Sequence, residues 1–134
     1  MQERILVIDD ERSVADTMAE ILSYAGYAAV AAHSAEEGLA EIRAQEPALM
    51  ISDVIMPGMN GVELSIQVRT SWPNVGILLM SGNAGTQAIV DTAGKFGHLF
   101  EILAKPIPPR ELLAKVALIL DARCERQSQT GEGK

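Results

Sequence analysis

The sequence predicts an α/β fold, (βα)5, in which a doubly wound parallel sheet of five strands is covered by helices on both sides. Short apolar runs recur between longer segments whose apolar residues have helical spacing. The runs have no alternating polar positions, which is typical of strands buried on both faces. A length of 134 residues suits one domain with a substantial core.

The strands are expected at five apolar runs, namely residues 5–8, 27–31, 49–54, 77–80 and 99–103. Between the runs, apolar side chains recur on one helical face, as Val14, Met18 and Ile21 do. The fourth helix has the weakest pattern, because residues 83–98 are rich in glycine and carry only a faint apolar stripe.

Three helix starts are marked by short motifs. Ser34 with Glu37, and Asn60 with Glu63, have the spacing of a capping box, in which each side chain of the pair bonds a backbone N–H of the other residue. Pro108-Pro109 can open the last helix, where a missing N–H costs nothing. Residues 1–122 are therefore predicted to form the domain, and residues 123–134 a polar C-terminal tail or the start of a linker.

Composition narrows the possible partners. The formal net charge of -7 argues against direct binding to nucleic acid or to an anionic membrane, since both require basic patches. The N-terminus lacks the pattern of a signal peptide, and no apolar run approaches the roughly 20 residues of a membrane span. A cytoplasmic location is expected.

Polar residues follow four of the five predicted strands. Asp9 and Asp10 follow the first, Asp53 lies at the end of the third, Ser81 follows the fourth and Lys105 the fifth. Ligands of open parallel sheets bind beyond the carboxyl ends of the strands, so these side chains are expected to meet at one edge.

Three carboxylates in one place need a cation. Two of them about 4 Å apart repel by about 1 kcal/mol in water and about 4 kcal/mol at a protein surface, and Lys105 can compensate only one charge. Mg²⁺ fits, because it binds carboxylates, water and phosphate oxygens. A carboxylate beside a metal, a lysine and a hydroxyl is also suited to accept a phosphoryl group as an aspartyl phosphate.

At this point the sequence resembles the receiver domain of bacterial two-component response regulators over about residues 4–121. The landmarks are "VIDDE", "DVIMPGMNG", "MSG" and "AKP", which occur in this order and each at a predicted strand end. The resemblance implies a flavodoxin-like fold with strand order 2-1-3-4-5 and a cis Lys105-Pro106 bond.

The resemblance also implies roles for the site residues. Asp53 would be the phosphoacceptor, with Asp10, Asp53 and the Ile55 carbonyl binding Mg²⁺ directly and Asp9 acting largely through water. Ser81 and Lys105 would detect the phosphoryl group. A sensor histidine kinase would supply that group, and an unidentified downstream protein or output domain would respond. Such a protein would be no enzyme beyond assisting its own phosphorylation and slow dephosphorylation.

The sequence departs from the usual receiver pattern at Ile102, where most receivers carry the Tyr or Phe whose ring moves during switching. The altered position leaves open a phosphorylation-independent interaction module on the same fold. A phosphatase with an aspartyl nucleophile is the weakest alternative, because Ile55 replaces the acid that it would need. Apolar Ile55 is instead expected to shield an acyl phosphate from water.

Glu11 has two interpretations of similar weight, a solvated helix start or a weak indirect role at the metal.

Overall fold

The computed structural model describes residues 2–82, 86–95, 97 and 100–132, with only the backbone for residues 86–88, 92 and 123–132. Strands and helices alternate along this part of the chain, as predicted. The elements are β1 (Arg4–Ile8), α1 (Arg12–Tyr24), β2 (Ala28–Ala32), α2 (Ala35–Ala44), β3 (Leu49–Asp53), α3 (Gly61–Ser71), β4 (Gly76–Ser81), α4 (Thr86–Lys95), β5 (Glu101–Ala104) and α5 (Pro109–Glu132).

The five strands form one parallel sheet in the order β2-β1-β3-β4-β5, which confirms the predicted topology. All five predicted strands differ from the observed ones by one or two residues at one end or both. The structure begins β1 at Arg4 and ends β3 at Asp53, β4 is one residue longer at each end, and β2 and β5 begin and end later than predicted. Leu99, the first residue predicted for the last strand, lies outside the described residues.

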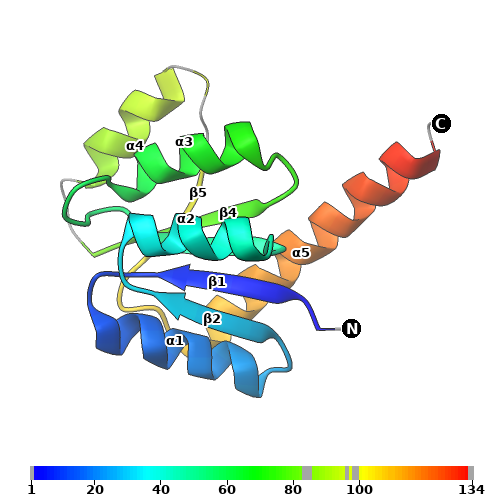
Figure 1. Ribbon diagram of the computed structural model, residues 1–134, viewed down its shortest axis with the longest axis horizontal. Coiled ribbons are helices and arrows are strands. Elements are labelled where there is room, and N and C mark those ends of the chain that lie inside the picture. Colours follow the sequence, from blue (N-terminus) through cyan, green and yellow to red (C-terminus); the bar gives the residue numbers. More distant parts are fainter. Residues whose placement is uncertain (1, 83–85, 96, 98–99, 133–134) are drawn as a thin grey trace.

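Helices cover both faces of the sheet, and each face has its own hydrophobic core. On one face, side chains of α2, α3 and α4 pack on strand residues such as Leu6 and Leu79. On the other, α1 and α5 pack on Val7 and Leu78. Figure 1 shows this arrangement, with α1 on the side of the sheet opposite α2, α3 and α4. All five residues of β3 are buried, because this strand is central in the sheet and covered on both sides.

The predicted caps form to different extents. At α3 the capping box is complete: the Asn60 side chain accepts from the Glu63 N–H at 2.8 Å, and the Glu63 carboxylate accepts from the Asn60 N–H at 3.0 Å. At α2 the Ser34 hydroxyl accepts from the Glu37 N–H at 3.1 Å, but it also donates to the Glu37 carboxylate in place of the reciprocal backbone bond. Both helices begin where the sequence predicts.

The last helix is longer than the apolar pattern indicates. It begins at Pro109, the second residue of the predicted Pro108-Pro109 start, and continues through residues 123–132, the segment expected to be a tail or linker. In Figure 1 its C-terminal part extends away from the sheet. The boundary of the domain at residue 122 stays a prediction, although the last buried side chain described on α5 is that of Leu120.

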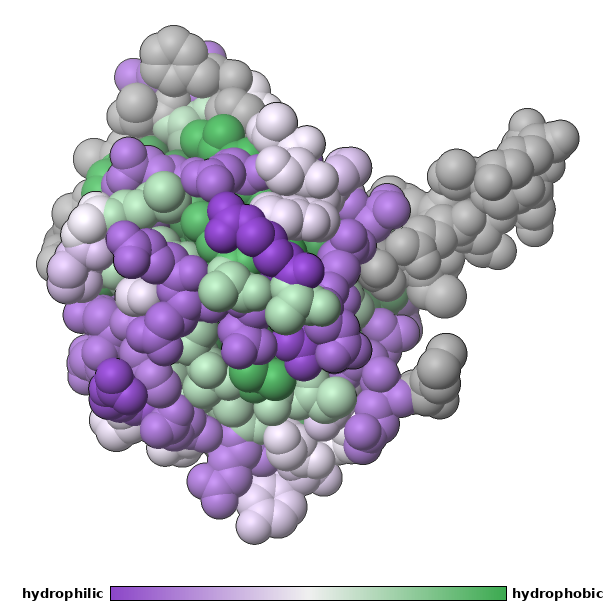
Figure 2. All heavy atoms as spheres, viewed as in Figure 1, coloured by the Kyte–Doolittle hydropathy of each residue, from purple (hydrophilic) through white to green (hydrophobic). Residues whose placement is uncertain are grey.

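The surface of the described part of the chain is largely polar on the face in view. Figure 2 shows hydrophilic side chains over most of it, with hydrophobic ones exposed only in small patches. Among the described residues, no helix is both long enough and apolar enough to cross a lipid bilayer.

Candidate functional site

Four adjacent strands bring the predicted site residues to one edge of the sheet. In the parallel register Ile8 pairs with Ser52, so Asp9 follows β1 at the level where β3 ends in Asp53. On the other side of β3, Ser81 at the end of β4 pairs with Ala104, and Lys105 comes next. The prediction that these side chains share one edge is confirmed by the register.

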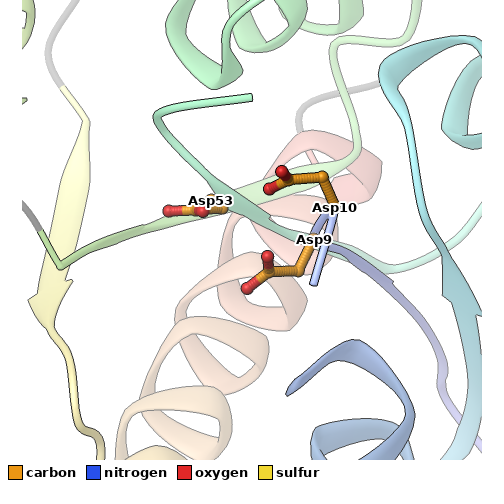
Figure 3. A group of neighbouring side chains, drawn as sticks. All are labelled: Asp9, Asp10 and Asp53. Atoms are coloured by element: carbon orange, nitrogen blue, oxygen red, sulfur yellow. The ribbon is translucent and has the colours of Figure 1, made fainter. Parts of the chain in front are cut away.

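The three aspartates form one cluster. Each offers a carboxylate oxygen, and these oxygens all lie within 4.8 Å of one another. Figure 3 shows Asp9 and Asp10 on the segment after β1 and Asp53 at the end of β3, with their carboxylates directed to the same side. Asp9 is fully buried and Asp53 is 8% exposed, whereas Asp10 is exposed. A ligand can therefore reach the cluster from the side of Asp10.

Lys105 is held by two of these carboxylates. Its Nζ donates to Asp9 Oδ2 at 2.7 Å and lies 3.3 Å from Asp53 Oδ2. Burial alone would lower the pKa of Lys105, but the hydrogen bond to Asp9 and the negative charges of Asp53 and Asp9 outweigh it, so this pKa lies above its ordinary value. The lysine is positively charged at neutral pH.

For Asp53, the phosphoacceptor candidate, the effect of burial on the pKa is not outweighed by the nearby charges. Burial raises the pKa of Asp53, the charge of Lys105 lowers it, and the charges of Asp9 and Asp10 raise it again, with a net shift above the ordinary value. Burial is the largest of these causes, and a second hydrogen-bond contribution of Lys105 also lowers the pKa. Counted as charges, three carboxylates still face one lysine. A second cation near Asp10 and Asp53 would relieve this repulsion.

The donor set fits Mg²⁺. Carboxylate oxygens are the hard ligands that this ion prefers, and the exposed side of the cluster leaves room for the waters that it retains. Asp9 already has protein partners on both oxygens, since Oδ1 accepts the Glu11 N–H at 3.0 Å and Oδ2 accepts Lys105. Asp10 and Asp53 are thus better placed than Asp9 to bind the ion directly. A cluster of this kind is typical of the Mg²⁺ site of receivers.

The remaining predicted residues lie around this cluster. Ser81 is half-buried, and its carbonyl accepts the Lys105 N–H at 2.7 Å. Gly82 has room for no more than a small group, because a Cβ there would lie 3.3 Å from Lys105 Cδ. Ile55 lies in the β3–α3 loop and is 41% exposed. The expected cis Lys105-Pro106 bond is present.

The structure also shows the surroundings of Ile102, which stands where most receivers carry an aromatic residue. Ile102 and Phe100 both pack against the core cluster on the side of α3 and α4, as strand alternation predicts for residues two apart. The Arg69 guanidinium of α3 lies over the Phe100 ring, 4.2 Å from its centroid.

Glu11 contacts the site through its backbone N–H, which donates to Asp9, while its side chain is exposed. Two other features of the site were not singled out from the sequence. Ser52 is fully buried and donates to the Asp53 carbonyl. Gly61 packs so closely on the same carbonyl that no Cβ fits. The signals were a hydroxyl inside an apolar strand and a glycine directly after a helix cap.

Comparison with known proteins identifies the family. A sequence model described as "Response regulator receiver domain" matches residues 5–117. The chain belongs to this family. It is therefore a receiver domain of two-component signalling, as the resemblance predicted.

Sequence relatives and solved structures support the same family assignment. The response regulator MprA of Mycobacterium tuberculosis is 33% identical over 120 residues, which are 90% of this chain and 51% of MprA. A CheY-like receiver from Methanospirillum hungatei has a TM-score of 0.83 at 29% identity, over 94% of this chain and 99% of that one. Chemotaxis protein CheY4 of Vibrio cholerae has a TM-score of 0.79 at 27% identity, over 89% and 99%. The chain spans about half the length of the curated relatives that it matches.

Proposed function

We propose that this receiver is a phosphorylation switch in which Asp53 accepts a phosphoryl group from a sensor histidine kinase, with Mg²⁺ bound. The observation that carries the proposal is the convergence of three carboxylates and one ammonium group. The oxygens of Asp9, Asp10 and Asp53 lie within 4.8 Å of one another, and Lys105 contacts two of the three carboxylates. Membership of the receiver family supports the same assignment.

In the proposed reaction an Asp53 carboxylate oxygen attacks phosphorus, a P–O bond forms, and the P–N bond to the kinase histidine breaks. Asp53 must be ionised to attack, and the nearby charge of Lys105 favours that form. When bound by Asp10, Asp53 and the Ile55 carbonyl, Mg²⁺ supplies positive charge beside the transferring oxygens. Lys105 would supply a second positive charge, and the Ser81 hydroxyl would donate a hydrogen bond to a phosphoryl oxygen.

A groove next to the acidic cluster supports protein docking at this edge. It has a volume of about 620 Å³ and opens between α1 and the start of α5. Apolar side chains, including Val14, Met18 and Ile107, line it together with Lys105. We infer that the kinase approaches from this side, because its histidine must come close to Asp53.

The proposed function also includes a cellular location and a downstream partner. We infer that the protein acts in the cytoplasm and that a downstream protein or output domain reads the phosphorylated surface. It would turn over no separate substrate, beyond assisting its own phosphorylation and slow dephosphorylation.

A phosphorylation-independent interaction module is the second candidate, and Ile102 favours it. An aliphatic side chain at this position cannot make the ring movement that couples many receivers to their partners. The complete acidic cluster argues against this candidate, since a module that never binds Mg²⁺ gains nothing from three crowded carboxylates.

Intact-mass spectrometry after incubation with Mg²⁺ and acetyl phosphate tests the proposal. The wild type should gain one phosphoryl group, whereas Asp53→Asn, and wild type with EDTA, should gain none. Asp121→Asn, which removes an exposed aspartate of α5, should behave as wild type. No mass gain by the wild type, together with no Mg²⁺ binding, would favour the interaction module.

A further inference from the structure

One buried hydroxyl interrupts the apolar strand that leads to the phosphoacceptor. Strand β3 reads Leu-Met-Ile-Ser-Asp, and Ser52 is 0% exposed. A buried hydroxyl is costly unless it makes a hydrogen bond. The hydrogen bond made by the Ser52 hydroxyl therefore indicates why this position is a serine.

The Ser52 hydroxyl donates to the carbonyl of the next residue, Asp53, at 3.0 Å. The register of β1 with β3 ends at the Ile8–Ser52 pair, so the Asp53 carbonyl lies past the last paired residues of that ladder. A buried carbonyl needs a donor. Ser52 supplies one at the point where β1 no longer continues beside β3.

Two further contacts hold Val54, the residue that follows this carbonyl. The Val54 N–H donates to the Met80 carbonyl of β4 at 3.0 Å, and the Val54 carbonyl accepts the Gly61 N–H at 2.8 Å. Gly61 begins α3 and lies directly against the Asp53 carbonyl, where any larger residue would collide with it. The peptide between Asp53 and Val54 is thus fixed from the strand, from the neighbouring strand and from the helix.

We propose that Ser52 is a positioning residue for phosphoryl transfer, whose hydroxyl fixes the Asp53 peptide and so the direction of the Asp53 carboxylate. The inference rests on the proposed function. Mg²⁺ demands nearly ideal octahedral geometry, so a small rotation of one ligand weakens its binding. The same segment continues to Ile55, whose carbonyl is the further proposed ligand. Ser52 therefore acts on the metal and on the nucleophile through the backbone.

The structure offers a matched control for this proposal. Ser65 on α3 is also 0% exposed, but its hydroxyl has no hydrogen-bond partner within the described part of the chain. Ser52→Ala and Ser65→Ala delete the same atom from equally buried sites. Only Ser52→Ala removes a hydrogen bond to the residue that would accept the phosphoryl group.

Mg²⁺ affinity, measured by isothermal titration calorimetry on the whole chain, is the first readout. Ser52→Ala should weaken Mg²⁺ binding roughly tenfold, the lower end of the loss seen when a metal ligand loses its supporting hydrogen bond. The rate of mass gain from acetyl phosphate should fall as well, even at saturating Mg²⁺. Ser65→Ala should leave both quantities at the wild-type level. Equal affinity and equal rate in the two variants would overturn the proposal.

A second pair of variants covers the case in which Ser52→Ala does not fold. Ser52→Thr and Ser52→Val have side chains of the same shape, and only threonine keeps the hydroxyl. Tighter Mg²⁺ binding by the threonine variant would support the proposal, and equal binding by both would overturn it.

The outcomes also separate this proposal from the proposed function. If the wild type is phosphorylated and the variants match it, only the role of Ser52 fails. If the wild type binds Mg²⁺ but gains no phosphoryl group, the proposed function fails, and a difference in Mg²⁺ affinity still establishes that Ser52 positions the metal ligands. A wild type that does neither overturns both.

Discussion

Neutralising the phosphoacceptor should stabilise the Mg²⁺-free protein. In Asp53→Asn, the repulsion of Asp53 by Asp9 and by Asp10 is lost, and so is the attraction to Lys105. With carboxylate oxygens within 4.8 Å, each repulsion is about 0.9 kcal/mol or more at the dielectric constant of water and about 3.5 kcal/mol at an effective value of 20. The Lys105 contact at 3.3 Å gives about 1.3 and 5 kcal/mol under the same two conditions.

The balance favours the variant. Once the Lys105 hydrogen bond to Asp53 is counted with the charge attraction, the attraction offsets the two repulsions, so the cost of burying the Asp53 charge, the largest cause of its raised pKa, decides the sign. Urea unfolding followed by circular dichroism in EDTA should therefore give Asp53→Asn the higher free energy of unfolding. Asp121→Asn controls for net charge, because it also changes the formal charge by one but lies on an exposed part of α5.

Mg²⁺ should reduce or reverse this difference. An ion present at 100 times its dissociation constant stabilises the protein that binds it by about 2.7 kcal/mol. The wild type should receive this stabilisation, and Asp53→Asn should receive less because it lacks one carboxylate. If EDTA and Mg²⁺ give the same ranking with the same gap, or if Asp121→Asn is stabilised as much as Asp53→Asn, the electrostatic reasoning is wrong.

The stability difference between Asp53→Asn and the wild type should depend on pH. Because the native pKa of Asp53 is raised above its unfolded value, the native wild type binds a proton more readily than the unfolded chain. The destabilising contribution of this carboxylate is thus fully present above the native pKa and disappears as the pH falls through it toward the unfolded value. In EDTA, the advantage of Asp53→Asn should shrink as the solution is acidified from neutral pH.

Three other substitutions test separate parts of the structure. Ile55→Asn should hasten loss of the phosphoryl group from Asp53 severalfold in an intact-mass time course, and equal rates would show that the exposed Ile55 does not shield it. Gly61→Ala should cost about 2 to 3 kcal/mol in urea unfolding, because its Cβ meets the Asp53 carbonyl. Asn60→Ala should cost about 1 kcal/mol through the broken capping box, and the loss should be absent if the helix start is held by Gly61 alone.

The fold could be predicted largely from the sequence because each strand is short, apolar and bounded by polar residues. With both faces covered, such strands leave few arrangements other than a parallel sheet. The extent of α5 could not be predicted in the same way. The sequence of residues 123–132 has no apolar stripe, so hydrophobic periodicity could not predict that the helix continues there.

The ends of the strands carried most of the information about the site. Asp9, Asp10 and Asp53 follow apolar runs, so topology alone brings them together. The sequence could not show which of the three aspartates is buried and which is exposed. That Asp9 is fully buried and bonded on both oxygens, whereas Asp10 is exposed, depends on the loop to α1 and on the path of Lys105.

Ile102 raises the question of how a change at Ser81 could reach the surface of β5. Phe100 shares the face of Ile102, but Arg69 lies over its ring, so any movement of Phe100 would cost the cation–π contact. A direct route remains in the backbone, because the Lys105 N–H donates to the Ser81 carbonyl at 2.7 Å and Ser81 pairs with Ala104. A shift of Ser81 toward a phosphoryl group would then act on β5 through the strand ladder, and it would not need an aromatic ring at position 102.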